Sequence, residues 1–265
     1  MKAGKQIATL AALAVLGAIA LGFFWHARQN PLLIGEVKAA PLQGRDATIG
    51  VFLNISNSGG PDRLVGARSI VAQRARLASA VADAGLPIPA DSTPSLAPDG
   101  AYILMDGVGG TLDEGRMIPI TLRFERAGEL RTQARLQTPR ATGEAARFGL
   151  FGIGDICIVE EGEPAPKIAL AVEPDGDGWR VRIDAEDFTF SSEMLDGPHV
   201  PGMGHAHLYV GGLKLQRVFE PEVRIGALPP GRHEVRVTLN TNDHRAYVVD
   251  DLPVIATEVI DVPAP

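Results

Sequence analysis

Short runs in which apolar and polar residues alternate recur along most of this chain, and that period predicts β-strands. Clusters of glycine, proline, asparagine and aspartate separate the runs and are typical of tight turns. We therefore expect an all-β protein made of two β-sandwich domains with Greek-key connections. The predicted strands are 47–56, 63–68, 73–78, 100–107, 117–123 and 129–136, followed by 168–173, 179–185, 188–190, 205–210, 214–219, 233–240 and 254–262.

An uncharged apolar run from Ile7 to Trp25 precedes the β pattern, with Lys2 and Lys5 before it. At about 19 residues the run is long enough to cross a bilayer as a helix, and the lysines favour a cytoplasmic N-terminus. No small-x-small cleavage site follows cleanly, which favours an uncleaved anchor over a cleaved signal peptide. We expect a single-pass inner-membrane protein with its domains in the periplasm. The alternative is a soluble periplasmic protein released by cleavage.

The composition of the chain indicates four parts. They are a membrane anchor or signal segment at 1–30, a first β-domain at 31–138, a linker at 139–166 and a second β-domain at 167–265. Residues 31–45, at the start of the first domain, have no clear strand pattern and are expected to form a tether.

Charge and cysteine content exclude several functions. A net charge of -7 argues against binding to nucleic acid or to anionic lipid surfaces. The single cysteine, Cys157, excludes an intramolecular disulfide and every zinc or iron–sulfur site built from several thiolates. Cys157 lies in an apolar neighbourhood and is expected to be a small buried residue rather than a ligand. A metal would have to be held by histidine, methionine and carboxylate side chains.

Such side chains gather around residues 201–209 and 242–244. Alternate residues of a strand project from one face, so Met203, His205 and His207 are expected to share a face. If this strand neighbours the strand at 233–240, His244 can join them. The predicted ligands are His205, His207, His244 and Met203, with Met194 and His199 as auxiliary ligands and Asp243 as a carboxylate that orients an imidazole.

These donors favour copper. Imidazole suits copper and zinc, whereas a thioether selects Cu(I). A blue-copper centre needs a thiolate, and the cysteine is expected to lie in the linker, outside the second domain. Zinc held by three histidines stays chemically open. The alternative without a metal is that His205 and His207 form a polar solvent face and His244 is a turn residue.

Several segments of the first domain form a recognisable pattern: Leu53–Ser58, Asp62–Ala67, Ile88–Ala90, Pro98–Gly100, Leu112–Gly115 and Ile120–Gly128. With these segments, residues from about 46 to 136 resemble the PCu(A)C periplasmic copper chaperones, a family with a cupredoxin-like fold. The resemblance implies a copper site of two histidines and two methionines. Here Ala78 stands at the first histidine position, and Tyr102–Leu104 at the His-x-Met position. Met105 is one residue out of register, so we expect a core residue and a first domain without copper affinity.

The second domain contains three further segments of this kind, Gly204–Val210, Leu228–Val235 and Val237–His244. With them, it resembles a C-terminal module found beside PCu(A)C domains in exported bacterial copper proteins. Its strand count also fits an immunoglobulin-like sandwich. This resemblance implies that the histidine-rich segments are the functional part of the domain.

We therefore expect a copper-binding protein, not an enzyme, that carries or buffers copper for a periplasmic donor or acceptor protein. A metal-free interaction or assembly module is the alternative. A zinc-dependent hydrolase is disfavoured because no general base is evident in the sequence. The oligomeric state stays open.

Overall fold

The computed structural model describes residues 31–42, 44–79, 85–137 and 156–264. These residues form twenty strands and contain no helix, which confirms the all-β prediction. Among them, no segment is a helix with the length and hydrophobicity needed to span a membrane. The predicted anchor at 1–30 lies outside the described residues.

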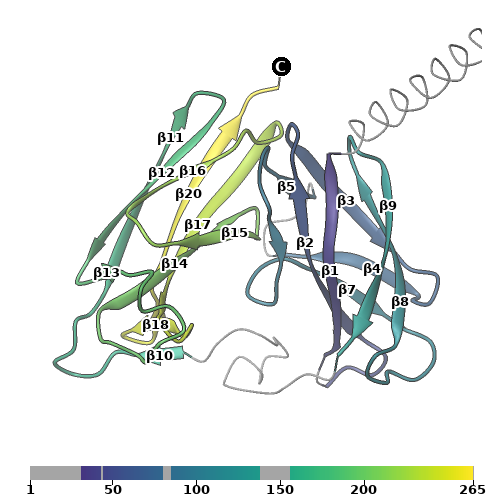
Figure 1. Ribbon diagram of the computed structural model, residues 1–265, viewed down its shortest axis with the longest axis horizontal. Coiled ribbons are helices and arrows are strands. Elements are labelled where there is room, and N and C mark those ends of the chain that lie inside the picture. The colour runs from purple at the N-terminus through teal and green to yellow at the C-terminus, as the bar shows by residue number, and fades with distance from the viewer. Residues whose placement is uncertain (1–30, 43, 80–84, 138–155, 265) are drawn as a thin grey trace, which may run out of the picture.

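The first half of the chain folds into one β-body, called the first body here (Figure 1). Its core consists of alternate strand residues, such as Val51, Leu53 and Ile55, that all point inward. The strands are β1 (Leu32–Pro41), β2 (Ile49–Asn57), β3 (Asp62–Arg68), β4 (Arg74–Ala78), β5 (Leu86–Ile88), β6 (Ser95–Leu96), β7 (Tyr102–Asp106), β8 (Met117–Phe124) and β9 (Glu129–Leu136).

The expected tether at 31–45 is wrong, because most of it is strand β1. This strand pairs antiparallel with β2 and parallel with the end of β9. A register shift between Ile34 and Val37 breaks the alternation of buried and exposed residues, so the period of two is lost in the sequence. Glycine, glutamate and lysine inside the strand weaken the signal further.

The second half folds into the second body, with a core of its own (Figure 1). The long strand β14 pairs antiparallel with β15 on one side and β17 on the other. Strands β11, β12 and β16 form a separate three-stranded sheet. The strands are β10 (Ile156–Ile158), β11 (Lys167–Asp175), β12 (Gly178–Glu186), β13 (Thr189–Phe190), β14 (Met203–Val210), β15 (Leu213–Val218), β16 (Glu222–Ile225), β17 (Gly231–Thr241), β18 (Ala246–Val249), β19 (Leu252–Pro253) and β20 (Ile255–Val262).

Part of the expected linker at 139–166 is the short strand β10, which pairs in parallel with β18 of the second body. Residues 138–155 of that segment lie outside the described residues. Cys157 on β10 is buried in the core of the second body, so the expectation that it lies outside the second domain is wrong.

The two bodies lie side by side and touch through the hairpin between β14 and β15 (Figure 1). Lys214 of β15 pairs with Ser95 of β6, and the amide of Ala101 donates to the carbonyl of Gly212 at 2.6 Å. Leu213 of the second body is fully buried in the core of the first. This contact brings the 97–101 turn of the first body close to strand β14.

Candidate metal centre

The pairing of β14 with β17 positions the histidines. His205 lies opposite Asn240 and His207 opposite Thr238. A Cβ atom at Gly204 would lie 1.9 Å from the Asn240 carbonyl oxygen, so the close approach of the two strands requires glycine at this position. The strand β17 ends at Thr241, beside the start of the histidine pair.

A tight turn at 242–245 then directs His244 back toward β14. The Thr241 amide donates to the Arg245 carbonyl at 2.8 Å, and the His244 amide donates to the Thr241 carbonyl at 3.0 Å. His244 has a φ of 68°, in the left-handed region. Asp243 accepts hydrogen bonds from the Thr241 hydroxyl and the Arg245 guanidinium, so its carboxylate belongs to the turn.

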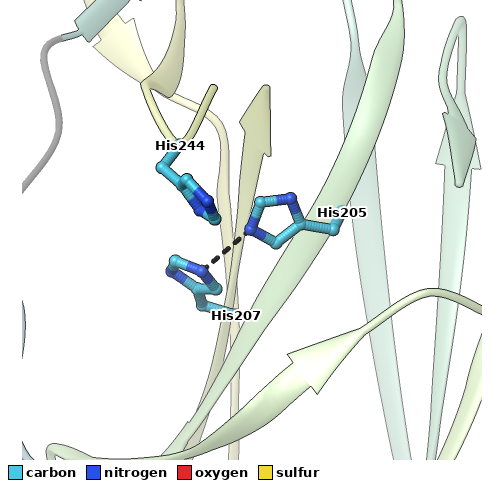
Figure 2. Close-up of side chains that lie close together, drawn as sticks. All are labelled: His205, His207 and His244. Atoms are coloured by element: carbon cyan, nitrogen blue, oxygen red, sulfur yellow. Dashed lines mark hydrogen bonds between the residues drawn. The ribbon is translucent and has the colours of Figure 1, made fainter. Parts of the chain in front are cut away.

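Three imidazoles converge on one another (Figure 2). They belong to His205, His207 and His244, which are called the triad here. The Nε2 atoms of His205 and His207 are 3.0 Å apart. The ring centroids of His205 and His244 are 5.0 Å apart, and one ligand atom from each of the three residues lies within 4.8 Å of the others. Strand alternation and the turn therefore bring together donors that are about 40 residues apart in the sequence.

Burial keeps the first two imidazoles neutral. His205 is fully buried and His207 nearly so. Desolvation lowers the pKa of His205 from 6.5 to about 4, with the nearby His244 and Arg217 acting in the same direction. Desolvation, helped by the charge of Lys214, lowers the pKa of His207 to about 2. Neutral imidazole is the form that binds metal, so the pair needs no deprotonation at neutral pH.

Outer hydrogen bonds orient two of the rings. The Asp196 carboxylate lies 2.5 Å from His244 Nε2. The Nδ1 atom of His207 lies 3.4 Å from the Tyr209 hydroxyl, which itself donates to Asp99 at 2.7 Å. Carboxylates that hold imidazoles in this way are typical of metal-binding histidines.

The ring of His205 has a different environment. It packs against Phe219, with ring centroids 5.8 Å apart. Its Nδ1 atom is buried and finds no hydrogen-bond partner among the described residues. A buried polar atom without a hydrogen-bond partner costs free energy, and no hydrogen bond from the described part of the chain holds this ring in place at Nδ1.

The spacing of the His205 and His207 nitrogens fits a shared metal ion. An ion bonded to both at about 2.0 Å would hold them about 2.8 to 3.3 Å apart for bond angles between about 90° and 109°. The observed 3.0 Å lies within that range. Small movements of the side chains would therefore suffice for coordination.

The remaining predicted residues lie around the triad in different ways. Met203 begins β14 and is half-buried, two residues before His205. Met194 lies in the 192–197 turn, where its backbone bonds Ser191 and Gly197. His199 lies 3.6 Å from the Sγ atom of Cys157 through its Nε2 atom. Burial raises the pKa of the Cys157 thiol, which keeps it protonated.

Sequence reasoning missed Phe219, which packs against His205, and three polar residues that contact the triad rings: Asp196, Tyr209 and Asp99. Tyr209 carried a signal, because it continues the alternation of His205 and His207 on the same strand. Asp196 and Asp99 had no such signal in the sequence, since each lies in a turn that only the folded structure brings to the site.

The first body contains no histidine, because none occurs between residues 27 and 198 of the sequence. Ala78 pairs with Tyr102 across β4 and β7, the positions where the PCu(A)C resemblance expects copper ligands. Met105 is fully buried in the core of the first body. The imidazole donors of the described residues therefore all lie in the second body.

Comparison with known proteins finds a family model that matches the first body. Residues 32–136 match the LpqE-like family, described as "Putative lipoprotein LpqE-like". This match agrees with the resemblance that the sequence indicates for this part of the chain. The match ends before the triad, so the second body is an additional β-rich part outside the family match. The comparison with curated proteins returns no match.

Three solved structures of PCuAC domains are similar to part of the chain. The "Copper-bound PCuAC domain from PmoF2" is 25% identical, with a TM-score of 0.38, and the match covers 42% of this chain and 95% of that one. The apo PmoF2 domain is 26% identical over 43% of this chain and 94% of that one, with a TM-score of 0.37. The apo PmoF1 domain is 25% identical over 42% and 96%, with a TM-score of 0.37.

Proposed function

We propose that this protein is an exported copper-binding protein that carries or buffers copper and performs no reaction. Its copper ligands are His205, His207 and His244, with Met203 as a thioether ligand. The observation that supports the proposal most directly is the convergence of three imidazoles, two of them buried and neutral. Copper is the cargo of such a protein, bound for delivery.

The choice of copper rests on donor chemistry. Nitrogen donors alone suit Cu(I), Cu(II) and zinc, and a thioether shifts the preference toward Cu(I). Met203 lies on the same strand face as His205 and His207 by alternation. The solved PmoF2 domain is described as copper-bound, which agrees with a copper context for a protein that carries a related domain.

The proposal includes an organisation of the chain. Residues 1–30 anchor it in the inner membrane or direct its export, 31–138 form a cupredoxin-like domain, and 156–265 form a Greek-key sandwich with the copper site. The LpqE-like match, described as a lipoprotein, supports export. The partner is a periplasmic protein that donates or accepts copper.

Anaerobic titration of the full-length protein in detergent with Cu(I), against a chromogenic chelator, tests the proposal. We expect about one equivalent of tightly bound copper, lost when His205→Asn and His207→Asn are combined, because amide oxygen is a poor ligand for soft Cu(I). His233→Gln is the matched control, since His233 is buried in the same body and its Nε2 lies 2.6 Å from the Pro229 carbonyl oxygen. Equal copper uptake by the double variant would refute the proposal.

The absence of histidine from the first body favours one second candidate, a metal-free module that binds an assembly partner. Under that hypothesis, the full-length protein takes up no copper, and its complex with a periplasmic partner persists in strong chelator. Zinc bound more tightly than copper would point instead to the three-histidine zinc sites of hydrolases.

A further inference from the structure

Asp99 belongs to the first body, yet its side chain contacts the second. It lies in the 97–101 turn and is mostly buried. Its Oδ2 atom accepts hydrogen bonds from the Tyr209 hydroxyl and the Lys214 ammonium group, each at 2.7 Å. Arg236 donates to the Asp99 carbonyl at 3.2 Å. Three side chains of the second body therefore converge on this one residue.

The contact extends to the triad through Tyr209. The phenol has one proton, which it donates to Asp99, so its oxygen accepts from the Nδ1–H group of His207 at 3.4 Å. The Asp99 carboxylate itself lies 3.6 Å from the same Nδ1 atom. A neutral imidazole with its proton on Nδ1 has a bare lone pair on Nε2. The Nε2 atom of His207 is the one that faces His205.

The position of Asp99 depends on how closely the two bodies pack. A Cβ atom at the next residue, Gly100, would lie 2.4 Å from the Gly212 carbonyl oxygen, so glycine permits this approach. The Ala101 amide donates to the same carbonyl. If the bodies separated, Asp99 would leave Tyr209, and His207 would lose the partner that fixes its tautomer.

We propose that Asp99 is a positioning residue for the copper site, so that copper binding in the second body and its packing against the first body are coupled. The inference rests on the proposed function, since it assumes that the triad binds copper. Coupling of two equilibria is reciprocal. Bound copper therefore stabilises the contact between the two bodies. A copper acceptor that separates the bodies lowers the affinity of the triad for copper.

Full-length Asp99→Asn tests this inference by Cu(I) competition. Outer partners of metal-bound histidines are typically worth about 10- to 100-fold in affinity, and we expect a loss in that range with about one equivalent still bound. Asp46→Asn is the matched control, because it removes the same charge from an exposed site of the first body. Tyr209→Phe removes the connecting hydroxyl and is expected to weaken copper binding to a similar extent.

Two further measurements separate positioning from a general loss of stability. Nitrogen-15 spectra of the Cu(I) form should show a shift of His207 Nδ1 in Asp99→Asn and none in Asp46→Asn. Hydrogen exchange should show that copper protects residues 95–101 of the first body in the wild type and not in Asp99→Asn.

The outcomes distinguish the two proposals. If the wild type binds copper and the double histidine variant does not, while Asp99→Asn and Tyr209→Phe keep the affinity, the 15N shift and the protection pattern of the wild type, the coupling is refuted and the proposed function stands. If the wild type binds no copper, both are refuted. Weaker copper binding by both variants, with the His207 shift, supports the coupling.

Discussion

The buried imidazole pair predicts that copper binding resists acid. At pH 5 an ordinary imidazole with a pKa of 6.5 is only about 3% neutral, so two such ligands would weaken copper binding by about a thousandfold relative to high pH. In this protein, burial lowers the pKa of His205 to about 4 and that of His207 to about 2. Both rings stay at least about 90% neutral at pH 5, so protonation of the two rings together lowers the affinity for copper by less than about twofold.

Cu(I) competition at pH 7, 6 and 5, with a chelator calibrated at each pH, measures this effect. The loss of copper affinity between pH 7 and 5 should correspond to no more than one proton released for each copper ion bound. A slope of two or more protons per copper would refute the reasoning, because it would mean that His205 and His207 titrate like exposed groups.

Phe219→Ala is the informative variant for the same assay. It removes the ring that packs against His205 and admits water. The pKa of His205 should then rise toward its ordinary value, and copper binding should become more sensitive to pH between 7 and 5. An unchanged pH profile would show that Phe219 does not exclude water from the imidazole.

Three more predictions follow from the same contacts. The metal-free protein should lose stability as the pH falls from 6.5 toward 4, because the unfolded chain takes up protons that the folded His205 and His207 exclude; urea unfolding at pH 7 and 5 measures this. Gly204→Ala should destabilise the protein by more than about 2 kcal/mol in urea unfolding, since its Cβ would lie 1.9 Å from the Asn240 carbonyl oxygen. Met105→Leu should cost less than about 1.5 kcal/mol and leave copper stoichiometry unchanged, as expected for a core residue; a lost equivalent in the titration would contradict that role.

Much of the fold could be predicted because most strands carry a simple period. Strand β9 was predicted with its observed bounds, Glu129–Leu136, from alternation alone. Strand β1 was missed because its bulge shifts the alternation by one residue. The short strand β18 (Ala246–Val249) was also missed, since four residues are too few to show a period.

The candidate site could be predicted where its parts lie on one strand. His205 and His207 share a face by alternation. His244 follows the strand at 233–240, and its place in the site depended on the assumption, borne out by the structure, that this strand pairs with β14. The contribution of Asp99 could not be predicted, because it depends on the packing of one body against another. Sequence spacing has no information about such contacts unless the relative placement of the bodies is known.

The backbone at His244 has a consequence for how this protein tolerates mutation. A left-handed φ of 68° suits glycine or asparagine, and a histidine there costs of order 1 kcal/mol. Selection for heat resistance alone would therefore favour His244→Gly or His244→Asn, and each would remove a nitrogen donor from the centre. The most thermostable variants at this position should be the poorest metal carriers.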